Sequence, residues 1–181
     1  MPHRFSGDFS RLESTERKKI LPVDRILREM NIRQGDTVID FGCGIGYFSI
    51  PLLDAVSDDG TVIAIDVSAE MLQELRKRGG ARKNLQIVQA NSLSGYTAHV
   101  ILLSMVLHEV DDPNRFLQTC FAALKPHGRV FVIEWQKMQA GSMGPPIEER
   151  LAKEDILGIT TVKYREHPLH EWVYFLEFIS R

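Results

Sequence analysis

The sequence has little of several features that mark specialised classes of protein. Its 181 residues contain only two cysteines, Cys43 and Cys120, and no C-x-x-C pattern, which favours free thiols in a reducing compartment over a disulfide framework. The longest apolar stretches, such as His99 to Val106, are too short to span a bilayer, and the N-terminus shows no apolar leader core. We therefore expect a cytoplasmic protein that is not embedded in a membrane.

The chain also lacks a marked excess of acidic over basic residues, or of basic over acidic ones. The formal net charge is -2, which gives no general attraction to nucleic acid or anionic lipid. His167 and His170 have the spacing of metal ligands, but no cluster of cysteines or carboxylates accompanies them. We expect these two histidines to lie in a solvated turn, and we expect no metal site.

The length and composition indicate one globular domain over residues 1–181. Hydrophobic residues make up 44% and charged residues 25% of the chain, which is ordinary for a folded domain of this size. The stretch from Ser14 to Met30 shows apolar residues at helical spacing with a break at Pro22. Residues 1–30 are therefore expected to form an N-terminal helical cap. The oligomeric state cannot be read from these patterns.

Strand and helix patterns then alternate through most of the chain with short connections. This rhythm predicts a parallel sheet with helices on both faces and right-handed crossovers. The strands are expected at 36–41, 61–65, 85–89, 99–104 and 129–135, and the helices at 47–56, 68–78 and from Asp112 or Asn114 to about Lys125.

The pattern changes after Trp135. Residues 139–146 are rich in glycine and proline and are expected to form a mobile loop, and 147–157 is expected to be helical. Residues 160–166 and 172–179 read as two strands joined by a connection short enough for an antiparallel pair. The predicted fold is thus α/β, Rossmann-like and doubly wound, with a mostly parallel seven-stranded sheet that ends in an antiparallel pair.

A glycine-rich turn follows the first predicted strand. Asp40 is followed by Gly42, Gly44 and Gly46, and Asp66 ends the next strand 22 residues after Gly44. Glycines there allow a sharp turn and a close approach of a ligand to the backbone, and a carboxylate at the end of the second strand is placed to bind a ribose diol. The spacing does not match the dinucleotide fingerprint G-x-G-x-x-G. A carboxylate ahead of the glycines would repel a pyrophosphate but suits a cationic ligand.

This motif resembles the first motif of class I S-adenosylmethionine-dependent methyltransferases. The segment Leu103 to Pro113 and the turn Leu124 to Arg129 are similar to the small-molecule methyltransferases related to ubiquinone and menaquinone biosynthesis enzymes. The resemblance covers about 14–179 and implies S-adenosylmethionine as cofactor, with S-adenosylhomocysteine as product.

The resemblance also implies which residues bind the cofactor. Gly42, Cys43 and Gly44 would pass under its methionine part, Asp40 would lie near its amino group, and Asp66 would bind the ribose. Gly46 of the same turn is also expected to contact the cofactor. Val67 and Met71 would flank the adenine, and Asn91 with Ser92 would lie at its amino group. The family usually has an acidic residue at that place, so Asn91 would accept a weaker hydrogen bond. Ser104, at the end of the fourth strand, would line the cleft.

His108 is the candidate catalytic residue, because the loop after the fourth strand faces the transferable methyl group in this fold. It could act as a general base or position the acceptor, with Glu109 and Asp111 holding its imidazole in one tautomer. It could also merely pack beside the next helix.

Methyl transfer from a sulfonium needs chiefly alignment, so no catalytic constellation is required and the acceptor must be inferred from what covers the cleft. The cover is small, comprising the N-terminal segment around 1–10, the loop at His108 and the loop 141–146. A small, partly apolar acceptor is therefore expected. Two alternatives remain: a sensor or complex subunit that binds S-adenosylmethionine without catalysis, and a protein that binds another nucleoside for a different reaction.

Overall fold

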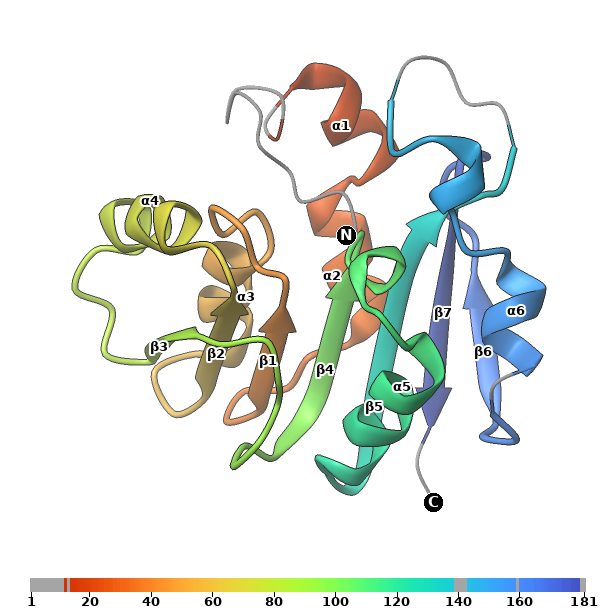
Figure 1. Ribbon diagram of the computed structural model, residues 1–181. Coiled ribbons are helices and arrows are strands. Elements are labelled where there is room, and N and C mark those ends of the chain that lie inside the picture. Colours follow the sequence, from red (N-terminus) through yellow and green to blue (C-terminus); the bar gives the residue numbers. More distant parts are fainter. Residues whose placement is uncertain (1–11, 13, 139–142, 159, 180–181) are drawn as a thin grey trace.

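The computed structural model describes residues 12, 14–138, 143–158 and 160–179. Its seven strands form one sheet in the order β3-β2-β1-β4-β5-β7-β6 (Figure 1). The strands are β1 (Thr37–Phe41), β2 (Thr61–Asp66), β3 (Leu85–Gln89), β4 (Ala98–Ser104), β5 (Leu124–Trp135), β6 (Tyr164–His167) and β7 (Val173–Ile179). Strands β1 to β5 pair in parallel, and β7 pairs antiparallel with both β5 and β6. The predicted fold class is confirmed.

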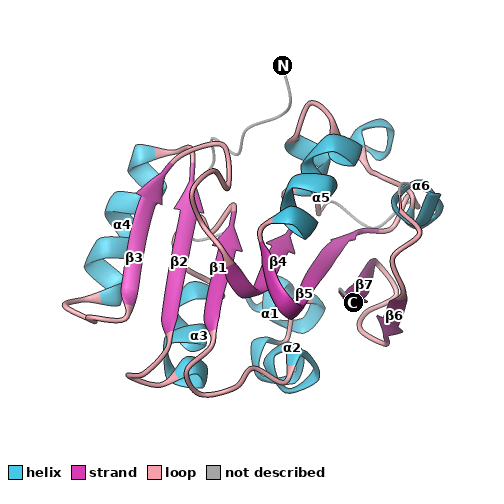
Figure 2. Cartoon of the chain, turned by 90° about the horizontal axis from the view of Figure 1, so that it is seen from below, coloured by secondary structure: helices cyan, strands magenta, loops and turns pink. Residues whose placement is uncertain are grey.

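Helices cover both faces of the sheet (Figure 2). On one face, α1 (Thr15–Ile20), α2 (Val23–Met30) and α3 (Ser49–Val56) pack against the strand side chains of one buried cluster. On the other face, α5 (Pro113–Ala122) and α6 (Lys153–Gly158) contribute side chains to a second buried cluster. The helix α4 (Ala69–Gly79) packs Leu72 and Leu75 against Ala64 of β2. The central parallel strands β1, β2 and β4 are therefore buried on both sides, whereas the edge strand β3 is only partly buried.

Capping residues set the starts of three helices. Ser14 accepts a hydrogen bond from the Arg17 backbone N–H, and Ser68 accepts one from Met71. Asp112 caps α5 by accepting from Arg115, with Pro113 at the first helical position. The break at Pro22 separates α1 from α2 as predicted.

Three predicted elements differ in the structure. The strand predicted over 160–166 is confined to Tyr164–His167. Strand β5 begins at Leu124 rather than at residue 129, because Leu124 pairs with Ala98 before the register shifts around His127, whose φ is +61°. The helix predicted over 147–157 is confirmed only in its second half, where α6 begins at Lys153. A short 3-10 helix, η3 (Ile147–Glu149), is separated from α6 because the backbone of Arg150 is extended.

The side chain of Arg150 explains this interruption. It is 95% buried and donates hydrogen bonds to the backbone carbonyls of Pro145, Gln136, Met138 and Met143. A helical Arg150 on the surface could not make these four bonds. Of the predicted mobile loop 139–146, residues 143–146 are therefore held by Arg150, and 139–142 lie outside the described residues, as does the proposed N-terminal cover at 1–10.

The expectation of a solvated His167 turn is also wrong. His167 is buried, with Nδ1 at 3.1 Å from the Glu29 carboxylate of α2 and Nε2 at 2.9 Å from the buried Glu177 of β7. Arg129 of β5 contacts Glu177 and donates hydrogen bonds to the backbone carbonyls of Met30, the last residue of α2, and of Asn31. The histidine thus joins α2 to the antiparallel edge of the sheet.

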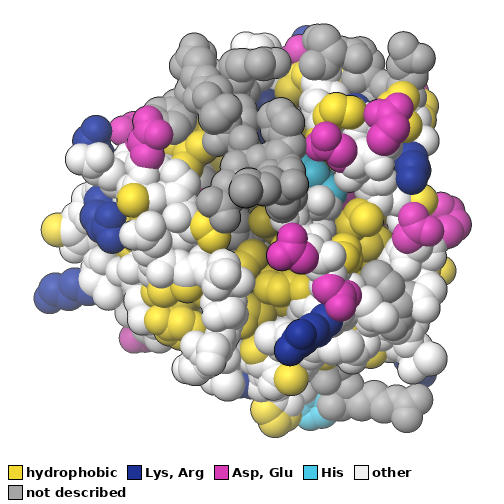
Figure 3. Space-filling model, in the orientation of Figure 1, with side chains coloured by type: hydrophobic (Ala, Val, Ile, Leu, Met, Phe, Trp, Pro, Cys, Tyr) yellow, Lys and Arg dark blue, Asp and Glu magenta, His cyan; other side chains and the backbone are white. Residues whose placement is uncertain are grey.

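Within the described part of the chain, no helix is both long and apolar enough to cross a membrane. The face seen in Figure 3 carries acidic and basic side chains interspersed over its surface.

Candidate active site

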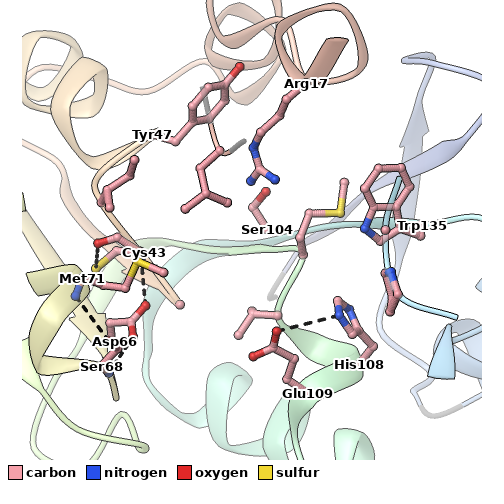
Figure 4. A pocket seen from close by; sticks show the side chains of 18 of the residues that line it. Arg17, Cys43, Tyr47, Asp66, Ser68, Met71, Ser104, His108, Glu109 and Trp135 are labelled. Atoms are coloured by element: carbon pink, nitrogen blue, oxygen red, sulfur yellow. Dashed lines mark hydrogen bonds and ion pairs between the residues drawn. The ribbon is translucent and has the colours of Figure 1, made fainter. Parts of the chain in front are cut away.

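A cavity of about 460 Å³ opens at the carboxyl ends of β1, β2 and β4. Strand β1 lies between β2 and β4 in the sheet, so the cavity sits where the strand order reverses, the usual place for a ligand in a doubly wound sheet. Its volume falls in the range of about 300–1,000 Å³ that is common for small-molecule sites. Eight of the predicted site residues line it: Gly42, Cys43, Gly44, Asp66, Val67, Met71, Ser104 and His108 (Figure 4).

The turn after β1 is tied to the end of β2 by backbone hydrogen bonds. The N–H groups of Gly42 and Cys43 both donate to the Ile65 carbonyl, at 2.8 and 3.1 Å. Gly44 has φ +53°, and a Cβ built on it would meet nothing within 4 Å. A side chain at Gly44 would therefore be strained and would project into the cavity that the turn shapes. The turn forms a cradle in which a ligand can lie directly on the backbone.

The Asp66 carboxylate is oriented by this same turn. Its Oδ2 accepts from the Gly44 N–H and its Oδ1 from the Ser68 N–H, both at 2.8 Å. Each carboxylate oxygen has a second lone pair, so Asp66 can still accept from two hydroxyls of a ligand. This geometry fits a ribose diol.

Two other glycines of the motif serve packing. A Cβ on Gly46 would lie 2.4 Å from Cδ1 of Leu75 in α4, and a Cβ on Gly42 would lie 2.5 Å from Val106. Gly46 does not line the cavity. It instead allows the turn and α4 to approach closely, so its predicted contact with a cofactor stays a prediction.

The adenine end is less fully assembled. Val67 and Met71 line the cavity after β2 and at the start of α4. Asn91 and Ser92 follow β3 in an exposed bend and are not among the lining residues. Their predicted contact with the adenine amino group stays a prediction.

Asp40 lies behind the glycine turn rather than on the cavity wall. Its carboxylate is 99% buried and accepts a 2.5 Å hydrogen bond from the Ser49 hydroxyl at the start of α3. Burial raises the pKa of Asp40 to about 6; the charge of Asp66 adds to this rise, and the Ser49 bond opposes it. Its predicted contact with the cofactor's amino group stays a prediction.

His108 lies in η2 (Leu107–Glu109), directly after β4 and opposite the Asp66 end of the cavity. Its Nδ1 is 2.8 Å from Oε2 of Glu134, which is almost fully buried in β5. The predicted partners were Glu109 and Asp111, but Glu109 lies 4.0 Å from Nε2. Sequence reasoning missed Glu134, although a single carboxylate within the apolar run Val130 to Trp135 requires a partner.

Glu134 fixes the protonation pattern of the histidine. Its Oε1 also accepts from the Leu107 N–H at 2.7 Å, and its Oε2 from the Trp135 N–H at 3.3 Å. Since both oxygens act as acceptors, Nδ1 donates, and Nε2 of the neutral ring is left to accept a proton. Burial disfavours the charged imidazole, but the hydrogen bond and charge of Glu134 outweigh it and raise the pKa of His108.

Several lining residues were not predicted from the sequence. They are Arg17 and Tyr47, which line the side nearest α1, and Trp135, which lines the wall near His108. Met143, Pro145 and Pro146 line the cavity as well, and they belong to the loop 141–146 that was predicted to cover it. Arg17 comes from a surface-like helical pattern, and Trp135 ends the apolar run of β5. Their convergence depends on tertiary packing that no local pattern encodes.

Fold and site together define a nucleoside-binding α/β domain of the class I methyltransferase type. The chain matches the methyltransferase domain family over residues 13–178. It belongs to that family, and this confirms the expected class and its cofactor, S-adenosylmethionine.

Curated relatives point to the same class. The chain is 33% identical over 112 residues to the ubiquinone/menaquinone biosynthesis C-methyltransferase UbiE of Legionella pneumophila, a match that covers 58% of this chain and 45% of that protein. It is 32% identical over 129 residues to the protein of the same name from Enterobacter sp., covering 67% and 48%. The chain thus spans about half the length of the curated relatives it matches.

Solved structures share the fold. An S-adenosylmethionine-dependent methyltransferase from Aquifex aeolicus superposes with a TM-score of 0.84 at 24% identity, covering 94% of this chain and 96% of that one. The N-methyltransferase NodS from Bradyrhizobium japonicum, solved with S-adenosylhomocysteine, gives a TM-score of 0.71 at 15% identity, covering 96% and 93%.

Asp40 generates a prediction about stability. With a pKa of about 6 when folded and about 3.9 when unfolded, the folded state binds more protons between these values. The free energy of unfolding should therefore fall by roughly 3 kcal/mol as pH rises from about 4 to 6, and stay at the lower value above that. In Asp40→Asn this contribution should vanish, as measured by urea unfolding across that pH range. The exposed Asp58→Asn is the control, and parallel curves for wild type and Asp40→Asn would refute the assignment.

Proposed function

We propose that this chain transfers a methyl group from S-adenosylmethionine to a small, partly apolar acceptor. One observation carries the proposal. A single cavity joins the Gly44–Asp66 cradle at one end to the His108–Glu134 pair at the other (Figure 4). A binding module that only senses the cofactor has no need for a buried, oriented histidine at the far end.

The residues of the cradle fit the cofactor. Asp66 would hold the ribose hydroxyls, the backbone of Gly42 to Gly44 would lie against the methionine part, and Val67 with Met71 would contact the adenine. When bound, S-adenosylmethionine supplies a methyl group that its sulfonium already activates. The protein therefore needs to align the acceptor and exclude water, which can lower a barrier by roughly 7–11 kcal/mol.

His108 would act as the general base for an acceptor that must lose a proton. Glu134 holds Nδ1 as a donor, so Nε2 would take the acceptor's proton and form an imidazolium that Glu134 stabilises. The raised pKa of His108 makes it a stronger base than an exposed histidine. Glu134 is a positioning residue, since it acts through the imidazole.

The walls around His108 favour an apolar, planar acceptor. Trp135 forms one side, and Met105, Met143, Pro145 and Pro146 complete the surface. Aromatic and methionine side chains bind flat apolar ligands well. The curated relatives are named for C-methylation in ubiquinone and menaquinone biosynthesis, which supports a small molecule.

The interspersed charges of Figure 3 and the net charge of -2 give no support to a nucleic-acid or membrane partner. A cytoplasmic location stays a prediction.

Asp66 tests the cofactor site. Asp66→Ala removes the acceptor for two hydroxyls and also frees the Gly44 N–H. The affinity for S-adenosylhomocysteine should therefore fall by roughly 2–3 kcal/mol, measured by isothermal titration. The Asp58→Asn variant, exposed and outside the cavity, should bind normally. An Asp66→Ala protein that binds as tightly as wild type would refute the ribose assignment.

His108 and Glu134 test the chemistry. With acceptors drawn from a metabolite extract and a labelled methyl donor, the rate should rise with pH through a midpoint above the ordinary histidine value of about 6.5, because the pKa of His108 is raised. His108→Asn should lose about 10²- to 10⁴-fold in kcat with cofactor affinity kept. Glu134→Gln should move the midpoint to lower pH, because burial of the imidazole then acts without the compensating charge.

The exposed His127→Asn serves as the matched control and should keep the wild-type profile. Near-normal kcat and KM in His108→Asn would leave alignment alone to account for catalysis. Tight binding of S-adenosylhomocysteine with no turnover of any acceptor would instead favour a non-catalytic sensor or complex subunit.

A further inference from the structure

The indole N–H of Trp135 has no hydrogen-bond acceptor among the residues that the structure describes. The residue is only 5% exposed. Its backbone N–H donates to Glu134 and its ring contacts the Arg150 guanidinium, but no atom accepts from Nε1. The fully enclosed side-chain polar atoms that lack a partner in the described chain belong to other residues, so this nitrogen can be reached from the cavity.

This lack of a partner points to a ligand. A buried tryptophan usually has an acceptor for its N–H, because an unpaired buried donor is costly. Figure 4 shows the indole nitrogen of Trp135 on the edge of the ring that faces the cavity, on the side of His108. A molecule in this part of the cavity would therefore meet a hydrogen-bond donor that the protein itself leaves unused.

The indole ring is held in one orientation by the segment that follows β5. The Arg150 guanidinium lies over the ring at 5.5 Å from its centroid and is fixed by four backbone carbonyls of that segment. Gly144 packs directly against the ring: its φ is +85°, and a Cβ there would lie 2.8 Å from Cδ2 and Cε2 of Trp135. Glycine allows this close approach. The N–H thus keeps a fixed direction, as a preorganised binding group must.

Trp135 and His108 are positioned by the same carboxylate. Oε2 of Glu134 accepts from the Trp135 backbone N–H at 3.3 Å and lies 2.8 Å from Nδ1 of His108. Both side chains line the cavity on the side away from Asp66 (Figure 4). Glu109 lies 4.0 Å from Nε2 of the imidazole. This end of the cavity therefore offers hydrogen-bond acceptors at the imidazole and Glu109, and a donor at the indole.

A hydroxyl group fits this arrangement, because it donates one hydrogen bond and accepts others. Its O–H would donate to Nε2 of His108, and its oxygen would accept from the indole N–H. An amine acceptor would have no such use for the indole, since its lone pair must attack the methyl group. Resting on the proposed function, we propose that Trp135 binds the oxygen of a planar acceptor that carries a phenol or enol hydroxyl.

The donor contributes most when the hydroxyl loses its proton. The O–H bond breaks, Nε2 of His108 takes the proton, and the electron pair stays on the acceptor, where the Trp135 N–H stabilises the negative charge on oxygen. An electron pair from this oxygen, or from a carbon conjugated with it, forms the bond to the methyl carbon while the pair of the C–S bond returns to sulfur. The imidazolium then releases its proton to solvent.

Two probes of the same shape test the proposal on the chain saturated with S-adenosylhomocysteine. They are 2-naphthol and naphthalene, which differ by one hydroxyl. Wild type should bind 2-naphthol roughly 3- to 30-fold more tightly, in line with the net gain from one or two hydrogen bonds. Trp135→Phe keeps an aromatic ring but removes the N–H, so it should lose several-fold of this preference and bind naphthalene as wild type does. Trp172→Phe, outside the cavity, is the matched control.

The indole N–H signals give a direct readout by NMR. The chain contains two tryptophans, so its proton–nitrogen spectrum should show two indole cross-peaks, which the two Phe variants assign. 2-Naphthol should move the Trp135 proton downfield relative to naphthalene, whose ring current is nearly the same. The Trp172 signal should stay in place with both probes.

Three results would count against these expectations, with thermal unfolding used to verify that each variant is folded. Equal weakening of both probes by Trp135→Phe would make the side chain an apolar wall only, which overturns the proposal. Weaker binding of S-adenosylhomocysteine by Trp135→Phe, with both probes unaffected, would assign the N–H to the cofactor and overturn it as well. Wild type that binds S-adenosylhomocysteine without preferring the hydroxyl refutes this inference alone, whereas no binding of S-adenosylhomocysteine refutes the proposed function.

Discussion

The hydrogen bonds between the turn after β1 and the end of β2 are the constraint on which the site depends. Ile65 and Asp66 together accept four backbone N–H groups, from Gly42, Cys43, Gly44 and Ser68. These bonds fix the glycine cradle, orient the Asp66 carboxylate and set the start of α4 in one arrangement. Because the bonds join the ends of two neighbouring parallel strands, the cradle is built directly on the sheet.

A second buried carboxylate gives the opposite end of the cavity its shape. Glu134 binds the backbone of η2 and the ring of His108, so the loop after β4 is attached to β5 through one side chain. Beyond it, Arg150 holds residues 143–146 against Trp135, over whose ring it lies at 5.5 Å. The acceptor end is thus formed by side chains that reach across elements, and the cofactor end by backbone.

This difference explains what the sequence could reveal. Alternating apolar runs, the break at Pro22 and the caps at Ser68 and Asp112 act locally, so the fold and most helix starts could be predicted. The glycine spacing and Asp66 are likewise a local signature. The roles of three residues could not be predicted from the sequence. Those of Arg17 and Glu134 arise from contacts between residues 26 or more positions apart, and that of Arg150 arises from an interrupted helix. His167 was misjudged for the same reason, since its partner Glu29 lies 138 positions away.

A crystal structure of the chain with S-adenosylhomocysteine would test the account most directly. The account predicts the ribose hydroxyls within hydrogen-bond distance of Asp66 and the sulfur between the glycine turn and His108. A nucleoside bound outside this cavity, or lying reversed with its ribose at His108, would contradict it.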